Sequence, residues 1–175
     1  MNKLENLWAG WRAEYLSQVK SDGLKENSEK TLFELIDESQ LPDEETFVIE
    51  KRRLTMVLLN AYPYTSGHLL VVPRRPVRTL AELQEEESES LWKMVTDSTV
   101  ILQKVFSPEG MNIGLNQGQA AGAGIPNHIH VHVVPRWGGD TNFTTVTANT
   151  RVIPESLFDT WTRISEAWSK SHDMN

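Results

Sequence analysis

Cysteine is absent from this chain of 175 residues. Its absence excludes a disulfide framework and every zinc, haem or iron–sulfur site that needs a cysteine ligand. A core of this size needs no such staple, because a chain of about 150 residues already buries most of the surface that unfolding would expose. We therefore expect one globular domain, with or without extensions.

A basic surface and long apolar runs are also lacking. The formal net charge is −7, which argues against a protein that binds the nucleic-acid backbone. No apolar run approaches the ~20 residues of a membrane-spanning helix. Residues Met1 to Asn6 are polar and contain no apolar signal-peptide region. These features predict a cytoplasmic protein with neither a nucleic-acid nor a membrane partner.

Hydrophobic periodicity divides the chain into helices and strands. Helical spacing predicts an N-terminal helix or a partly helical arm within residues 4–15, and a helical turn at 32–36. It also predicts a long helix from the acidic run 85–89 to residue 105, and a C-terminal helix from Leu157 to Trp168. Apolar runs predict strands at 46–49, 55–59, 68–72, 111–115 and 129–134. Strands clustered in this way favour an α+β domain with an antiparallel sheet. We expect the stripe that contains Trp161 and Trp168 to pack in the core.

Three of the five histidines, His128, His130 and His132, fall within five residues. If this segment is a strand, its side chains alternate between faces, so the three imidazoles share one face and the apolar residues between them share the other. A structural role explains a single histidine easily, but it does not explain three in register. We therefore interpret the run as functional.

One functional interpretation is a metal site. His-x-His on a strand is a common arrangement for zinc or iron. The further ligands are scarce, because His68 and His172 are the only other histidines and Asp140 is the nearest acid. A metal site stays open as an alternative on these grounds.

The other interpretation is nucleophilic catalysis on phosphorus. A neutral imidazole is a competent nucleophile near pH 7, and neighbouring imidazoles can fix its tautomer and donate hydrogen bonds to phosphate oxygens. The glycine-rich segment from Asn116 to Gly124 lies directly upstream, and such loops bring backbone N–H groups close to phosphate. Together they favour phosphoryl or nucleotidyl transfer.

The run from Asn127 to Trp137, NHIHVHVVPRW, resembles the signature of the histidine triad superfamily. Two upstream segments agree, LNAYP at 59–63 and SGHLLVVPR at 66–74. Segments 7–12, 135–143 and 150–155 are similar to a bacterial branch whose members are diadenosine tetraphosphate phosphorylases or hydrolases. The resemblance divides the chain into an N-terminal extension (1–45), a core domain (46–146) and a C-terminal extension (147–175).

The resemblance implies roles for four histidines. His130 would attack the α-phosphorus and become a covalent nucleotidyl-histidine. His132 would contact the phosphate and the bridging oxygen, while His128 would bind backbone and orient its neighbour. His68 would support the triad from a neighbouring strand.

The resemblance also implies four nucleotide contacts. Asn60 would bind the ribose hydroxyls, and Asn116 the ribose or the phosphate. The backbone amides of Gly124 and Ile125 would meet the α-phosphate. Ile125 is a departure, because relatives that carry a hydroxyl there gain a phosphate contact that this chain lacks. Arg74, Arg75 and Arg78 are either additional polyphosphate contacts or solvated surface residues.

The fold that the resemblance implies is a five-stranded antiparallel sheet with flanking helices, joined to a second sheet across a homodimer. Many relatives bind a structural zinc through a Cys-x-x-Cys pair near the position of residues 29–33. This chain has no cysteine there, so we expect neither a metal nor a cofactor.

We therefore expect an enzyme that cleaves nucleoside 5′-phosphate derivatives, above all dinucleoside polyphosphates such as diadenosine tetraphosphate. Water as acceptor makes it a hydrolase and inorganic phosphate makes it a phosphorylase, and the sequence does not choose between them. The alternatives are a nucleoside phosphoramidate hydrolase and a nucleotide-binding regulatory module with negligible turnover.

Overall fold

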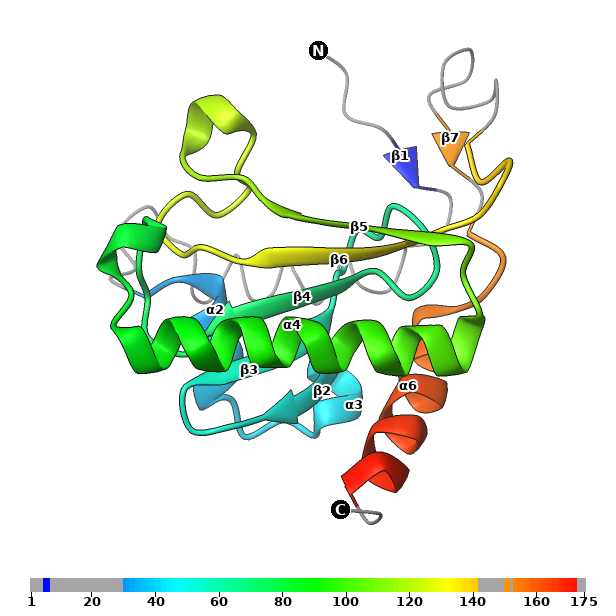
Figure 1. Ribbon diagram of the computed structural model, residues 1–175, viewed down its shortest axis with the longest axis horizontal. Coiled ribbons are helices and arrows are strands. Elements are labelled where there is room, and N and C mark those ends of the chain that lie inside the picture. Colours follow the sequence, from blue (N-terminus) through cyan, green and yellow to red (C-terminus); the bar gives the residue numbers. More distant parts are fainter. Residues whose placement is uncertain (1–4, 7–29, 142–149, 152, 173–175) are drawn as a thin grey trace.

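A five-stranded antiparallel sheet forms the centre of the protein (Figure 1). The computed structural model describes residues 5–6, 30–141, 150–151 and 153–172. The strands lie in the order β2-β3-β4-β6-β5, with bounds Val48–Lys51 (β2), Thr55–Leu59 (β3), Leu69–Pro73 (β4), Gly110–Leu115 (β5) and Val131–Arg136 (β6). All four neighbouring pairs are antiparallel. The expected α+β fold with this sheet is confirmed.

Helices cover both faces of the sheet. On one face lies the long helix α4 (Glu85–Phe106), together with α6 (Leu157–His172) (Figure 1). Side chains of α2 (Leu32–Glu38) pack on the other face, where Phe33 and Ile36 join a second apolar cluster. Short helices occupy Asp43–Thr46 (α3), Leu80–Glu82 (η1) and Gln119–Ala121 (η2). Every residue of β3 and β4 is buried as a result, as continuous apolar runs require.

The C-terminal helix packs in the main core. Ile164 and Trp168 of α6 are buried in the same cluster as Val131 and Val133 of β6, and the indole N–H of Trp161 donates to the carbonyl of Val48 at 2.7 Å. The expected core packing of the tryptophan stripe is confirmed. The division of the chain into a core domain and two extensions stays a prediction. Within the described residues, no helix combines the length and the apolar character needed to cross a membrane.

Two strands begin two residues later than the sequence predicts. The strand expected at residue 46 starts at Val48, because Asp43–Thr46 forms α3 and Phe47 ends that helix in a left-handed conformation with φ 58°. The strand expected at residue 129 starts at Val131, so only the last histidine of the triad lies on it. The alternation of apolar residues predicts which side chains face the core, but it does not predict the residue at which hydrogen bonding to the neighbouring strand begins.

The N-terminal helix or partly helical arm expected within residues 4–15 stays a prediction, because only two residues of this segment are described. Glu5–Asn6 forms a short parallel strand, β1, with Thr150–Arg151, β7. The other residues of that segment, including Leu7 to Arg12, lie outside the described residues.

Candidate active site

Four histidines converge at the junction of β4 and β6. The rings of His130 and His132 lie 5.0 Å apart between centroids, and those of His68 and His132 lie 5.1 Å apart. Leu70 of β4 pairs with His132 of β6, which brings the start of β4 beside the triad. The structure therefore brings together the four histidines that the sequence singled out.

The His128 ring bridges two elements. Its Nε2 lies 2.7 Å from the carbonyl oxygen of Pro73, and its Nδ1 lies 2.8 Å from the hydroxyl of Thr31. A carbonyl only accepts, so Nε2 carries the proton, and in the neutral ring Nδ1 accepts from the threonine hydroxyl. The ring is fully buried. The His128 ring therefore fixes residues 128–130, which precede β6 and lie outside its pairing with the neighbouring strands.

Among the described residues, only one ring nitrogen of His130 has a hydrogen-bond partner. Its Nδ1 lies 3.0 Å from the carbonyl oxygen of His128, so Nδ1 donates. In a neutral imidazole the lone pair then resides on Nε2. Phe33 of α2 packs against this ring with a centroid distance of 5.2 Å, and His130 is buried. This arrangement leaves Nε2 with the lone pair that a nucleophile requires.

His68 sets the tautomer of His132. The backbone N–H of Tyr64 donates to Nδ1 of His68 at 3.1 Å, so the proton of this ring lies on Nε2. That Nε2–H donates to Nδ1 of His132 at 2.9 Å, and His132 must carry its own proton on Nε2. One imidazole of the triad therefore offers a lone pair and the next offers a proton.

Burial keeps the triad neutral. Desolvation lowers the pKa of His128 and of His130 below the ordinary histidine value. Desolvation, with a smaller contribution from His130, lowers the pKa of His132 to about 4. The tautomers deduced from the hydrogen bonds require neutral rings, and these pKa shifts agree with them.

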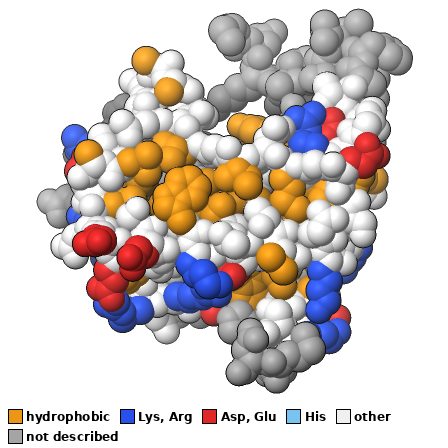
Figure 2. All heavy atoms as spheres, in the orientation of Figure 1, with side chains coloured by type: hydrophobic (Ala, Val, Ile, Leu, Met, Phe, Trp, Pro, Cys, Tyr) orange, Lys and Arg blue, Asp and Glu red, His pale blue; other side chains and the backbone are white. Residues whose placement is uncertain are grey.

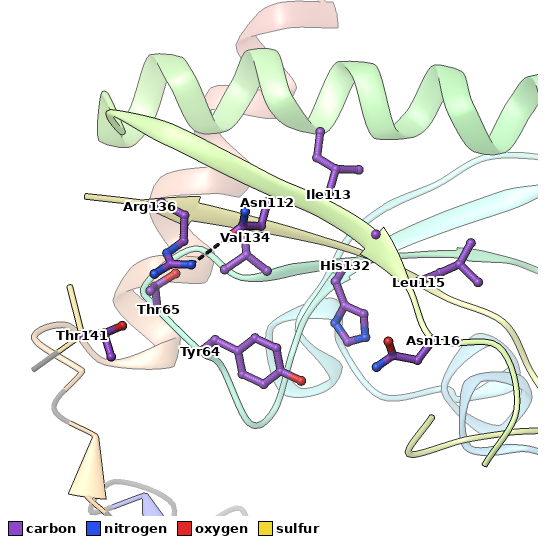
Figure 3. Close-up of a pocket in the computed structure, with 11 residues that line it drawn as sticks. Tyr64, Thr65, Asn112, Ile113, Leu115, Asn116, His132, Val134, Arg136 and Thr141 are labelled. Atoms are coloured by element: carbon purple, nitrogen blue, oxygen red, sulfur yellow. Dashed lines mark hydrogen bonds between the residues drawn. The ribbon is translucent and has the colours of Figure 1, made fainter. Parts of the chain in front are cut away.

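A cavity of about 380 Å³ opens beside His132. It lies between β5, the end of β6 and the loop that follows β3, and Figure 3 shows the imidazole between Tyr64 and Asn116. Its other lining residues are Thr65, Asn112, Ile113, Gly114, Leu115, Val134, Arg136 and Thr141. This volume falls within the usual range of small-molecule sites.

The predicted nucleotide contacts lie in different places. Asn116 lines the cavity beside His132. Gly124 is exposed and Ile125 is half-buried, and within the described residues neither backbone N–H has a hydrogen-bond partner. Asn60 does not line the cavity; its amide donates to the His68 ring, and its oxygen accepts from the Tyr62 N–H at 2.9 Å. The predicted ribose contact of Asn60 stays a prediction.

Two of the three candidate arginines pair with carboxylates. Arg74 contacts Asp37 at 2.8 Å and Arg75 contacts Glu87 at 2.6 Å. Arg78 is exposed. None of the three lines the described cavity, so their possible contact with polyphosphate stays a prediction.

Sequence reasoning missed three residues that shape the site. Thr31 holds His128, Phe33 covers two triad rings, and Arg136 lies at the far end of the cavity. Thr31 lies in the stretch, residues 29–33, near which the resemblance places the Cys-x-x-Cys pair of many relatives. Its hydroxyl accepts from the Glu34 N–H at 3.4 Å, while the Glu34 carboxylate accepts from the Thr31 N–H at 2.7 Å. No group of three metal-binding side chains occurs in the part of the chain that the structure describes.

Comparison with known proteins identifies the family. The sequence profile of the HIT domain matches residues 42–139. That is more than half of the chain, and it includes His68, the glycine-rich segment and the triad. The chain belongs to the HIT domain family.

Individual relatives and structures of this family share more than the triad. The AP-4-A phosphorylase of Mycobacterium tuberculosis is 40% identical over 171 residues, which cover 97% of this chain and 87% of that protein. The Bis(5'-nucleosyl)-tetraphosphatase [asymmetrical] of Schizosaccharomyces pombe is 37% identical over 53% of this chain and 50% of its own length. A Zn-bound histidine triad family protein from Mycobacterium smegmatis has a similar fold, with a TM-score of 0.67 at 24% identity over 83% of this chain and 98% of that one.

Proposed function

We propose that the protein cleaves dinucleoside polyphosphates, with diadenosine tetraphosphate as the model substrate, through a covalent nucleotidyl-His130. The observation that carries the proposal is the pair of tautomers: His130 presents a free Nε2 lone pair, and His132 presents an Nε2–H. The 40% identity to an AP-4-A phosphorylase over nearly the whole chain supports this substrate class.

In the first step, Nε2 of His130 attacks the α-phosphorus. A P–N bond forms as the bond from this phosphorus to the bridging oxygen breaks. The electron pair of the broken bond stays on that oxygen, which is the terminal oxygen of the departing nucleoside polyphosphate. The His132 Nε2–H donates a hydrogen bond to this oxygen. The backbone amides of Gly124 and Ile125, which have no partner among the described residues, bind the α-phosphate oxygens.

In the second step, an acceptor attacks the α-phosphorus and the P–N bond breaks, which returns the lone pair to His130. The acceptor is water in a hydrolase and inorganic phosphate in a phosphorylase. The proton of the attacking water passes to a phosphate oxygen of the released AMP, and a phosphate dianion as acceptor needs no such transfer. This chemistry uses no metal at the nucleophile.

The experiment follows the products from adenine-labelled diadenosine tetraphosphate with and without inorganic phosphate. AMP and ATP formed without phosphate identify a hydrolase, whereas ADP and ATP formed only with phosphate identify a phosphorylase. Quenched reactions are digested, and the adenylylated peptide is sequenced by mass spectrometry. A label on any residue other than His130, or no turnover by the wild-type protein, contradicts the proposal.

We also propose that two copies pair along β5. This strand is an edge of the sheet, most of its residues are exposed and Ile113 is 46% exposed. Exposed Trp92 and Val100 lie on α4, and Figure 2 shows a band of hydrophobic side chains on this face. An unpaired apolar edge is a template for pairing with another chain. Light scattering should give a dimer mass for the wild type and a monomer mass for Ile113→Lys.

A further inference from the structure

The cavity beside His132 extends away from the nucleophile. His132, Val134 and Arg136 alternate along β6, so their side chains share one face of the sheet. At about 3.3 Å per residue, the first and last of them are about 13 Å apart along the strand. Both line the cavity (Figure 3). It therefore runs from the imidazole that contacts the leaving oxygen toward a guanidinium group.

The floor of this cavity is open beside the imidazole. Gly114 of β5 pairs with His132, and a Cβ atom at this glycine would meet no other atom within 4 Å. Along the opposite wall, the exposed ring of Tyr64 stacks on His132 at an interplanar angle of 14°. The hydroxyl of Thr65 donates to the carbonyl of Pro135 at 2.8 Å, which fixes this wall to β6.

The far end of the cavity carries a positive group with unused donors. Nε and Nη2 of Arg136 donate to Asp140 at 2.6 and 2.8 Å, and Nη1 donates to the Asn112 side chain at 2.6 Å. A guanidinium has five N–H groups, so two remain without a partner within the described residues. The Arg136 side chain is 41% exposed. No carboxylate appears among the described lining residues.

We propose that this cavity is the subsite for the phosphate chain of the leaving nucleotide, and that Arg136 binds that chain at its far end. The inference rests on the proposed function, because it places the leaving group at His132. When the bridging bond breaks, the oxygen that takes its electron pair lies at the imidazole, and the remaining phosphates extend over Gly114 toward the guanidinium. Arg136 is thereby a specificity residue for leaving groups that are long and anionic.

The test compares two substrates that share the adenylyl group. Diadenosine tetraphosphate releases a nucleoside polyphosphate, whereas adenosine 5′-phosphoramidate releases ammonia, which is too small to reach Arg136. Arg136→Gln should lower kcat/KM about tenfold or more for the tetraphosphate, because a charge-assisted contact is lost. The loss for the phosphoramidate should stay below about threefold, since only the local packing changes.

Three further variants test separately the charge next to Arg136, the width of the cavity and the general effect of losing an ion pair. Gly114→Val narrows the cavity beside His132, and it should also reduce tetraphosphate turnover more than phosphoramidate turnover. Asp140→Asn frees the guanidinium from its carboxylate and should lower KM for the tetraphosphate. Arg163→Gln is the matched control, because Arg163 is also half-exposed and pairs with Glu155 at 2.8 Å outside this cavity; it should affect both substrates equally.

The outcomes are distinct. If Arg136→Gln lowers kcat/KM equally for both substrates, the subsite proposal is overturned. This arginine then only stabilises the turn after β6. A change confined to the KM for inorganic phosphate overturns it in favour of an acceptor site. The subsite is also overturned if both Arg136→Gln and Gly114→Val keep the wild-type ratio of kcat/KM for the tetraphosphate to kcat/KM for the phosphoramidate. Failure of the proposed function looks different, because the wild-type protein then does not turn over diadenosine tetraphosphate, whether or not it cleaves the phosphoramidate.

Discussion

The two ends of the histidine face differ in what their polar groups bind. At the end that contains His128 and His130, the rings are buried under α2, and the polar atoms bind Thr31, Pro73 and backbone. At the end that contains His132, the face opens into a cavity lined mostly by uncharged side chains. The closed end fixes the protonation and orientation of the His128 and His130 rings. The open end leaves N–H donors that a substrate can bind.

This difference explains how a chain with net charge −7 can process an anionic substrate. The proposed phosphate contacts are directional N–H groups: the His132 imidazole, the loop amides and two guanidinium donors. Directional donors of this kind stabilise developing charge without a large positive surface. The hydrogen bonds at the closed end orient the proposed nucleophile, His130. At the open end, local N–H donors bind the anionic substrate in place of long-range attraction by a positive net charge.

The largest expected effect is at the nucleophile. His130→Gln removes the Nε2 lone pair that forms the P–N bond, so kcat for diadenosine tetraphosphate should fall at least about a thousandfold. Product formation in timed, quenched reactions measures the rate. Mass spectrometry of the same samples tests whether the nucleotidyl adduct is missing. A thermal-unfolding midpoint close to that of wild type serves as the control for folding. Adduct formation at wild-type rate in this variant would place the nucleophile elsewhere.

The next effect tests whether proton donation at the open end depends on His68. His68→Phe removes the donor to Nδ1 of His132, so the His132 proton can move to Nδ1 and leave the bridging oxygen without a donor. We expect about a hundredfold loss with diadenosine tetraphosphate. An AMP ester of p-nitrophenol, whose leaving group needs no proton, should lose less than about fivefold. Equal losses on the two substrates would show a general packing defect instead.

A smaller effect tests the closed end. Thr31→Val removes the hydroxyl that donates to His128, and the loss of about one hydrogen bond should lower kcat about fivefold. KM should stay unchanged, and Thr31→Ser should restore the rate. Glu34→Ala weakens the N-terminal cap of α2 but leaves the threonine hydroxyl in place, so it should reduce stability without reducing kcat. Identical kinetics in the valine and serine variants would remove Thr31 from the positioning network.

The smallest effect is the response to pH near neutrality. Burial lowers the pKa of His130, so the neutral nucleophile should persist below pH 6.5, and kcat/KM should change less than about twofold between pH 8 and 6.5. A pH–rate profile with an acidic limb at or above 6.5 contradicts this.

The same groups predict the pH dependence of folding. The unfolded chain protonates His132 near pH 6.5, whereas its folded pKa is about 4. In that window the unfolded state binds more protons, so the free energy of unfolding should fall as pH drops from about 6.5 to 4. Urea denaturation at pH 7 and pH 5 measures the difference, and His132→Gln should reduce it.

Much of the fold followed from pattern alone. Continuous apolar runs predicted β3 and β4, because a strand covered on both faces has no polar side. Helical spacing of apolar residues predicted α4, and three of these residues, Leu91, Val95 and Leu102, are buried. The late start of β6 was missed, because pairing depends on where β4 and β5 lie rather than on the histidine run itself.

The sequence by itself determined the chemistry available here: three alternating imidazoles, a fourth upstream, a glycine-rich loop and no cysteine. These are local properties, since side-chain alternation and residue type need no partner. Only the tertiary structure decided which nitrogen carries each proton, because Thr31, Pro73 and Tyr64 reach the imidazoles from other elements. It also decided which arginine lies at the cavity: all three form ion pairs, but only Arg136, and neither Arg74 nor Arg75, lines the described cavity.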